Sequence, residues 1–195
     1  MFIGFYGASV LLTYIGLAFS VTGMVLAFLG HIPAAVMCLI LAGVCDMFDG
    51  KIARSKKNRT DDEKVYLVDG TVARACKRSE TEKKFGIQID SLVDTVSFGV
   101  FPIVLGICMG FTSKLNTVVY IIYGLAAVIR LAYFNVLAEE KTVFNKRKKE
   151  NVSYYFGLPV TSVAIILPFT YNLNIFMHPS VFLKAYPLVM LMTAI

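Results

Sequence analysis

Residues 34–54 read AAVMCLILAGVCDMFDGKIAR, an apolar run that ends in two aspartates, a glycine and a basic segment. Residues 85–94 read FGIQIDSLVD and open a later apolar run with two more aspartates. A membrane helix needs about 20 mostly apolar residues, and both runs are long enough once their polar ends are included. The four aspartates therefore stand where two predicted membrane helices reach the same membrane surface.

The composition of the whole chain agrees with a membrane protein. The 195 residues are 57% hydrophobic and 16% charged, with a mean hydropathy of +0.69, whereas an ordinary soluble domain is roughly 25% charged. This excludes a disordered chain and argues against a soluble globule. The length fits one domain over residues 1–195. The net charge of +6 in so apolar a chain favours contact with lipid headgroups and not with nucleic acid.

Apolar runs predict an all-α, polytopic membrane protein with about six spans. The expected spans are residues 7–30, 34–49, 85–110, 117–137, 158–176 and a last run from about residue 181. The last run is short for a span, which leaves a truncated C-terminus open.

Basic residues orient these spans. Eleven lysines and arginines lie within residues 51–84 and five within residues 141–149. The positive-inside rule places both loops in the cytoplasm, so with six spans both termini are cytoplasmic too. We expect a multi-pass protein of the cell membrane whose aspartates face the cytoplasm.

Spacing brings the aspartates together in pairs. Asp46 and Asp49 share one helix face, as do Asp90 and Asp94. An ionised carboxylate at the edge of a span is costly unless it is paired or metal-bound. The helix dipole accounts for Asp90 in a first turn but disfavours the other pair near a helix C-terminus. Converging carboxylates therefore suggest a hard divalent cation, Mg²⁺ or Mn²⁺.

The pair Asp46 and Asp49 is followed by three residues that are suited to a phosphate-bearing ligand. Gly50 allows close backbone approach, Ala53 is small and lies on the neighbouring helix face, and Arg54 offers a planar fork for phosphate. Each is weak evidence alone, but their order is specific. The order is Asp46-x2-Asp49-Gly50-x2-Ala53-Arg54, then Gly86-x3-Asp90-x3-Asp94.

This order resembles the signature of the CDP-alcohol phosphatidyltransferases. The segments DSLVD at 90–94, SFGVFP at 97–102, RLAYFN at 130–135 and GLP at 157–159 are similar to the phosphatidylserine synthase branch. The resemblance covers nearly the whole chain. It implies a reaction in which CDP-diacylglycerol and L-serine give phosphatidylserine and CMP. Many members are homodimers, so a homodimer is left open.

The resemblance also implies roles for the residues. Asp46, Asp49 and Asp90 would hold two divalent ions, which Asp46 and Asp90 would bridge. Asp94 would be the general base for the acceptor hydroxyl and would also touch the second ion. The CDP moiety would contact the residues Gly50, Ala53, Arg54 and Gly86.

One departure from the family concerns a loop that is partly duplicated. Residues 48–64, FDGKIARSKKNRTDDEK, resemble residues 68–83, VDGTVARACKRSETEK. The family usually has about eight residues between its arginine and its second glycine, but 31 separate Arg54 from Gly86 and 11 separate Arg74 from Gly86. We favour the first copy, because Tyr66 replaces the leading aspartate in the second. The duplicated cytoplasmic loop, about residues 55–84, could also impair the enzyme.

Arg130 lies inside the predicted fourth span, where a charge is functional by default. It is suited to the serine carboxylate or to a phosphate, and pairing with a site aspartate is the structural alternative. Apart from Lys184 it is the only cation within an apolar run, which favours an unphosphorylated acceptor such as serine over glycerol phosphate or an inositol phosphate.

Two other classes of protein remain as alternatives. A divalent-cation transporter would use the carboxylates as a transport site, but such sites usually lie near the bilayer midplane. A non-catalytic membrane scaffold would leave the aspartates unexplained.

Overall fold

The computed structural model describes the backbone of residues 8–59, 66–68, 71–73, 80–144, 160–173 and 179–194. Side chains are described over residues 10–51, 85–137, 160–173 and 186–193. The helices are α1 (Ala8–Phe28), α2 (Ile32–Arg59), α3 (Glu80–Asp94), a π-helix η1 (Thr95–Val100), α4 (Phe101–Cys108), α5 (Lys114–Phe144), a 3₁₀ turn η2 (Val160–Ser162), α6 (Val163–Leu173) and α7 (Pro179–Ala194). Two short strands, β1 (Tyr66–Val68) and β2 (Thr71–Ala73), form a hairpin.

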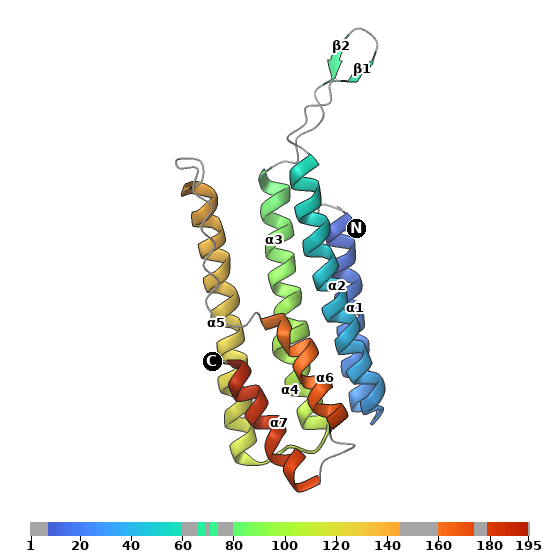
Figure 1. Cartoon of the computed structure of the whole chain (residues 1–195), viewed down its shortest axis with the longest axis vertical. Coiled ribbons are helices and arrows are strands. Elements are labelled where there is room, and N and C mark those ends of the chain that lie inside the picture. Colours follow the sequence, from blue (N-terminus) through green and yellow to red (C-terminus); the bar gives the residue numbers. More distant parts are fainter. Residues whose placement is uncertain are drawn as a thin grey trace.

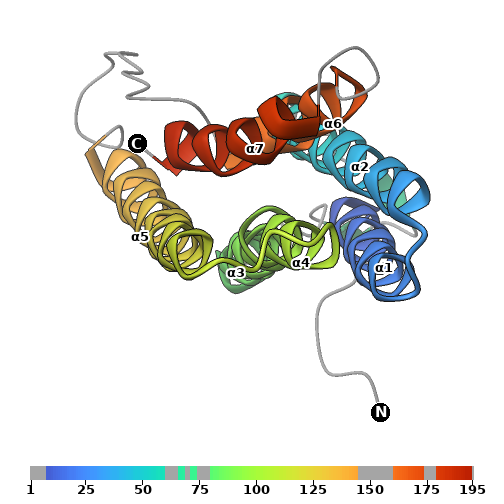
Figure 2. The same ribbon diagram turned by 90° about the horizontal axis from the view of Figure 1, so that it is seen from below.

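The helices run side by side in one bundle (Figure 1). Helix α1 packs along α2, α3 and α4, while α2 also packs on α6 and α5 packs on α7. Seen along the bundle, α2 and α6 lie on one side and α3 and α4 on another, with α1 between α2 and α3 (Figure 2). The predicted all-α, polytopic membrane fold is confirmed.

Four helical stretches of the described chain are long and apolar enough to cross a membrane. They are Val10–Phe28, Ile32–Lys51, Phe85–Cys108 and Lys114–Leu137, and they coincide with the first four predicted spans to within a few residues. The fifth predicted run corresponds to a shorter apolar helix, Val160–Leu173, and the sixth to α7. The total of six spans therefore stays a prediction.

The outer face of α5 carries exposed apolar side chains. Leu115, Ile121 and Ile129 expose more than half of their surface. Most of this helix is not covered by the rest of the bundle. Apolar side chains exposed along a whole span are typical of contact with lipid, where the solvent is as apolar as leucine.

The predicted third span is one apolar helix in sequence, but the structure divides it. After Asp94 the chain forms the π-helix η1, and α4 follows with Pro102 in its first turn. Pro102 has no N–H and cannot donate to the carbonyl of Phe98 one turn earlier. The Tyr123 hydroxyl on α5 donates to that carbonyl, and the Tyr186 hydroxyl on α7 donates to the carbonyl of Pro102 at 2.8 Å. The Tyr123 hydroxyl thus takes the place of the missing backbone donor, and Tyr186 adds a second contact to this turn.

Removing one of these hydroxyls should destabilise the protein. Tyr123→Phe keeps the buried ring but leaves the Phe98 carbonyl without its donor, so we expect a loss of about 1 kcal/mol in unfolding free energy. The measurement is denaturant unfolding in detergent micelles. Tyr133→Phe is the control, because Tyr133 is 60% exposed. Equal stability of the two variants would contradict this role for Tyr123.

Close helix contacts require small residues in α1 and α2. A Cβ on Gly43 would lie 2.5 Å from the Cβ of Ala164 in α6, and one on Gly23 would lie 2.8 Å from the Cβ of Cys38 and collide with the ring of Phe101. Small residues at helix interfaces let membrane helices approach closely. These contacts hold α1, α2 and α6 in fixed register beside the π-helix.

Candidate metal and substrate site

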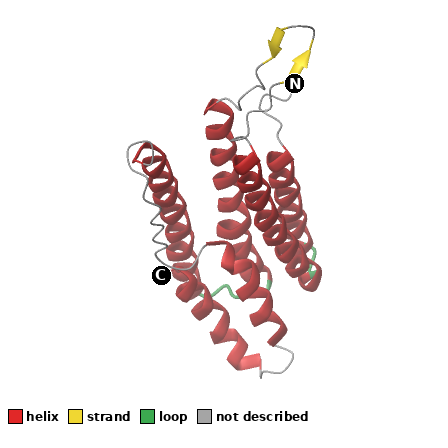
Figure 3. Ribbon diagram, turned by 45° about the horizontal axis from the view of Figure 1, so that its top comes forward, coloured by secondary structure: helices red, strands yellow, loops and turns green. Residues whose placement is uncertain are grey.

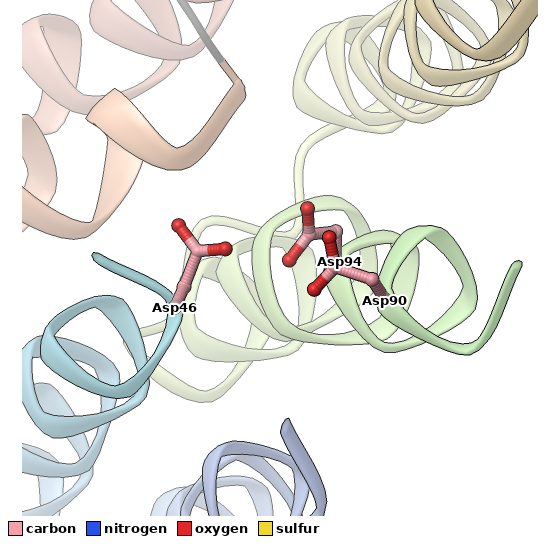
Figure 4. Close-up of side chains that lie close together, drawn as sticks. All are labelled: Asp46, Asp90 and Asp94. Carbon is pink, nitrogen blue, oxygen red and sulfur yellow. The ribbon is translucent and has the colours of Figure 1, made fainter. Parts of the chain in front are cut away.

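Three of the predicted aspartates come together between two helices. Asp46 on α2 points toward Asp90 and Asp94 on α3 (Figure 4). One carboxylate oxygen from each lies within 4.8 Å of the other two. Asp90 and Asp94 meet because residues four apart lie on one helix face, and α1 and α3 pack together beside α2. The predicted convergence of the two aspartate pairs is therefore observed for these three residues.

The environment of these carboxylates fits a cation. Asp94 is buried, and Asp46 and Asp90 are half-buried. One oxygen of Asp90, Oδ1, is buried and has no hydrogen-bond partner among the described residues. A buried charged oxygen without a partner is costly, and three carboxylates so close repel one another. Within the described side chains no lysine or arginine pairs with them, so a hard divalent cation with oxygen ligands is the fitting partner.

Asp49 lies beside this group but is held differently. Its side chain is 5% exposed, and its Oδ2 accepts a hydrogen bond from the Thr13 hydroxyl of α1 at 2.9 Å. Asp49 lines a small pocket together with Asp46 and Asp94, whereas the group of three close oxygens comes from the other aspartates. The full lining is Thr13, Gly16, Ala42, Asp46, Asp49, Val93, Asp94, Ser97 and Phe98.

Hydroxyl residues of the site were not predicted from the sequence. Thr13 and Ser97 line the pocket, and the hydroxyls of Ser97 and Ser20 are hydrogen-bonded at 2.7 Å. Thr13 and Ser20 are seven residues apart, so they share one face of α1. That spacing of two hydroxyls within an apolar run was the available signal, because a buried hydroxyl needs a partner.

A second polar contact ties α3 to α5 next to the carboxylates. The Nδ2 of Asn135 donates to the hydroxyl oxygen of Ser91 at 2.7 Å, and that oxygen lies 3.1 Å from the carbonyl of Ile87. Ser91 directly follows Asp90. The bond therefore fixes the rotation of α3 that points Asp90 toward α2.

The predicted substrate-binding residues are located in part. Gly50 and Gly86 are half-buried on α2 and α3. Ala53 and Arg54 lie on the backbone of α2, but their side chains fall outside the described residues. Arg130 on α5 is half-buried, and its guanidinium carbon lies 5.9 Å from the centre of the Phe134 ring.

The structure does not bring Arg130 into the pocket described above. It is not among the lining residues, and in the described part of the chain it forms no ion pair with a site aspartate. The pairing alternative for Arg130 thus finds no support.

The two copies of the duplicated motif differ in local structure. The first continues α2 from Asp49 to Arg59 without a break. In the second, strands β1 and β2 pair so that Val68 faces Thr71, with Asp69 and Gly70 between them in sequence. Figure 3 shows these strands apart from the helices. Asp-Gly between two strands is typical of a two-residue hairpin turn, so the same dipeptide stands in a helix in one copy and between strands in the other.

Comparison with known proteins agrees with this site. The family model described as CDP-alcohol phosphatidyltransferase matches residues 8–64 and 67–194. The chain is similar to proteins named CDP-diacylglycerol--serine O-phosphatidyltransferase from Saccharomyces cerevisiae, at 34% identity over 54% of this chain and 37% of the relative, and from Methanocaldococcus jannaschii, at 36% over 51% and 41%.

A protein of the same name from Mycobacterium tuberculosis strain H37Rv is 30% identical over 70% of this chain and 39% of the relative. The matched parts thus span about two fifths of the length of these relatives. No solved structure matches the chain. Because the family model covers nearly all of the chain and the aspartates of the family signature converge in the bundle, the chain belongs to the CDP-alcohol phosphatidyltransferase family.

Proposed function

We propose that this protein transfers a phosphatidyl group from CDP-diacylglycerol to L-serine, giving phosphatidylserine and CMP. The observation that carries the proposal is the meeting of Asp46, Asp90 and Asp94, together with a buried oxygen of Asp90 that has no partner among the described residues. Relatives of this chain are named for the same reaction. In this proposal residues 1–195 form one catalytic membrane domain.

The aspartates would hold two divalent ions, Mg²⁺ or Mn²⁺. Such ions neutralise a pyrophosphate and polarise the phosphorus under attack. Asp46, Asp49 and Asp90 would be ligands, with Asp46 and Asp90 shared between the ions. Their attachment to two helices that α1 packs against gives the site a rigid frame, which keeps the carboxylate positions fixed when the substrate binds.

Asp94 would be the general base. It lies one helical turn beyond Asp90 and on the same face, so its carboxylate can take the proton of the serine hydroxyl. The hydroxyl oxygen then bonds to the phosphorus that carries diacylglycerol, while the bond from that phosphorus to the CMP oxygen breaks. CMP leaves with the electron pair of that bond, and the proton stays on Asp94.

The nucleotide would lie against the helix turn that follows Asp49. Gly50 leaves room for the backbone to approach a phosphate, and Arg54 would donate to it. Gly86 stands one turn before Asp90 on α3, where a Cβ would meet nothing closer than Val10 at 4.0 Å. These residues would bind the CDP end while the acyl chains stay in lipid.

Arg130 would bind the serine carboxylate from α5. Its guanidinium has no acidic partner in the described part of the chain, so a ligand carboxylate remains a suitable partner. Binding of glycerol phosphate or an inositol phosphate would need further cations, and the described spans carry only Lys51 and Lys114 besides Arg130. This favours serine as the acceptor.

The proposal places the carboxylates at the cytoplasmic surface of the cell membrane. Asp46 and Asp49 lie near the end of the stretch Ile32–Lys51, and Asp90 lies near the start of Phe85–Cys108. The basic residues that follow Lys51 are the kind that stays in the cytoplasm. A carboxylate site near helix ends also favours an enzyme over a transporter. A homodimer remains part of the proposal through the family resemblance.

One experiment tests the proposed reaction. The purified full chain is incubated in mixed micelles with CDP-diacylglycerol, Mn²⁺ and one of several alcohols, and CMP release is measured. We expect release with L-serine and little with glycerol phosphate or an inositol phosphate. Release with another alcohol alone would assign a different acceptor, and release of CMP with none of them would reject the proposed function.

The duplicated loop gives a separate prediction. Deleting residues 60–79 leaves 11 residues between Arg54 and Gly86, close to the family spacing, and joins the described ends of α2 and α3. We expect CMP release at or above the level of the full chain, because the residues near the carboxylates come from the first copy.

The two arginines of the duplicated motif provide a matched pair for this prediction. Arg54→Ala in the full chain should raise the KM for CDP-diacylglycerol about tenfold, the size expected for one charge-assisted hydrogen bond. Arg74→Ala should leave it near the original value. The opposite ranking would mean that the second copy binds the nucleotide.

A further inference from the structure

Helix α1 carries none of the acidic residues but touches the site at a polar residue. The Thr13 side chain is 6% exposed, and its hydroxyl donates to Oδ2 of Asp49 at 2.9 Å. Hydroxyls within apolar helices usually bond to the carbonyl of their own preceding turn, as Thr170 does to Ile166. The Thr13 hydroxyl reaches across to a carboxylate on another helix.

The position of Thr13 is fixed by two further contacts on the same helix face. A Cβ on Gly16 would lie 3.3 Å from the Cβ of Cys45, so α1 and α2 approach closely at this level. One turn further along, the hydroxyl of Ser20 bonds to that of Ser97 in the π-helix and lies 3.0 Å from the carbonyl of Gly16. This face of α1 is hydrogen-bonded to Asp49 of α2 through Thr13 and to Ser97 through Ser20. Helix α1 therefore cannot slide or rotate without breaking a buried hydrogen bond.

We infer that Thr13 is a positioning residue of the metal site, whose hydrogen bond to Oδ2 orients the Asp49 carboxylate toward a cation. The inference rests on the proposed function for the identity of the ion. Partners of ligating carboxylates fix ligand orientation, and their loss typically costs about 10–100-fold in metal affinity or activity. The Thr13 hydroxyl on Oδ2, together with the backbone N–H of Gly50, limits the orientation of the Asp49 carboxylate in a pocket that Asp46 and Asp94 also line.

The test measures Mn²⁺ binding to the full chain in detergent by electron paramagnetic resonance of free Mn²⁺, without substrates. Thr13→Val keeps the shape of the side chain and removes the donor, so we expect Mn²⁺ affinity to fall by about tenfold or more. Thr13→Ser keeps the hydroxyl and should bind Mn²⁺ nearly as tightly as the original protein. Thr170→Val is the matched control, because it removes a similarly buried threonine hydroxyl that, among the described residues, bonds within its own helix, and the affinity for Mn²⁺ should not change.

Turnover supplies a second readout. In the Thr13→Val variant, the turnover rate should fall at subsaturating Mn²⁺ and should recover partly when the Mn²⁺ concentration is raised. A general loss of folding would not respond to the ion. If the Thr13→Val protein elutes as an aggregate, Thr13→Ala takes its place. Its Mn²⁺ affinity is expected to lie below that of Thr13→Ser and of the original protein.

Several outcomes would overturn the inference. One is a Thr13→Val protein that binds Mn²⁺ as tightly as the original, and another is a Thr13→Ser protein that is weakened as much. Absence of Mn²⁺ binding in the original protein would also reject it. By contrast, an acceptor other than serine would contradict only the proposed function, because the order of Mn²⁺ affinities does not depend on the acceptor.

Discussion

Replacing Asp94 by asparagine is expected to lower the rate of phosphatidyl transfer to serine by roughly 10²–10⁴-fold, the usual contribution of a positioned general base. A serine hydroxyl is a weak nucleophile near neutral pH, and the amide of asparagine cannot accept its proton. Asp94 is 8% exposed and lies within 4.8 Å of the oxygens of Asp46 and Asp90, so it is close to the reaction centre. The measurement is kcat from CMP release at saturating Mn²⁺ and serine.

The same variant distinguishes a base from a metal ligand. Asp94→Asn should change the KM for CDP-diacylglycerol and the affinity for Mn²⁺ much less than it changes kcat. Asp46→Asn should weaken all three, because Asp46 is proposed as a shared ligand of both ions. Normal turnover by Asp94→Asn would reject the general-base role, and a loss of Mn²⁺ affinity as large as that of Asp46→Asn would show that Asp94 acts mainly as a metal ligand.

Much of the fold followed from the apolar runs. Membrane helices form locally and their lengths are set by the bilayer, so the first four spans could be placed within a few residues. The break in the third span could not, although Pro102 was visible in its apolar run. Pro102 removes a backbone donor to the carbonyl of Phe98, and the hydroxyl that replaces this donor belongs to Tyr123, in a distant segment of the chain.

The site was predictable to the extent that helix periodicity decides it. The spacing of Asp90 and Asp94 puts them on one face, and the packing of α1 against both α2 and α3 brings Asp46 near them. Helix periodicity does not predict which of the four carboxylates come closest together. Asp49 was expected to converge with the other three aspartates, but its Oδ2 bonds to Thr13 and Asp49 is not part of the group of three close oxygens. The contribution of α1 was missed because the spacing of Thr13 and Ser20 indicates a polar face on α1 but not which helix that face contacts.

Removing divalent metal should abolish activity, the second large effect that the structure supports. Asp46, Asp90 and Asp94 offer oxygens within 4.8 Å of one another, and the buried Oδ1 of Asp90 has no partner among the described residues. With no cation, these charges oppose one another and the pyrophosphate of the substrate adds negative charge to the same place. We therefore expect CMP release to fall to background in excess EDTA.

Restoring Mg²⁺ or Mn²⁺ to the chelated protein should recover the activity, because chelation removes only the ion and leaves the helices packed. Asp46→Asn should need more metal for half-maximal rate, by more than the 10–100-fold typical of an outer partner, since it removes a direct ligand. Asp69→Asn is the control from the second copy of the motif, where the same Asp-Gly pair stands between β1 and β2, and its metal requirement should stay unchanged. Full turnover in excess EDTA would show that the carboxylates serve another purpose, and a metal requirement altered by Asp69→Asn but not by Asp46→Asn would transfer the site to the second copy.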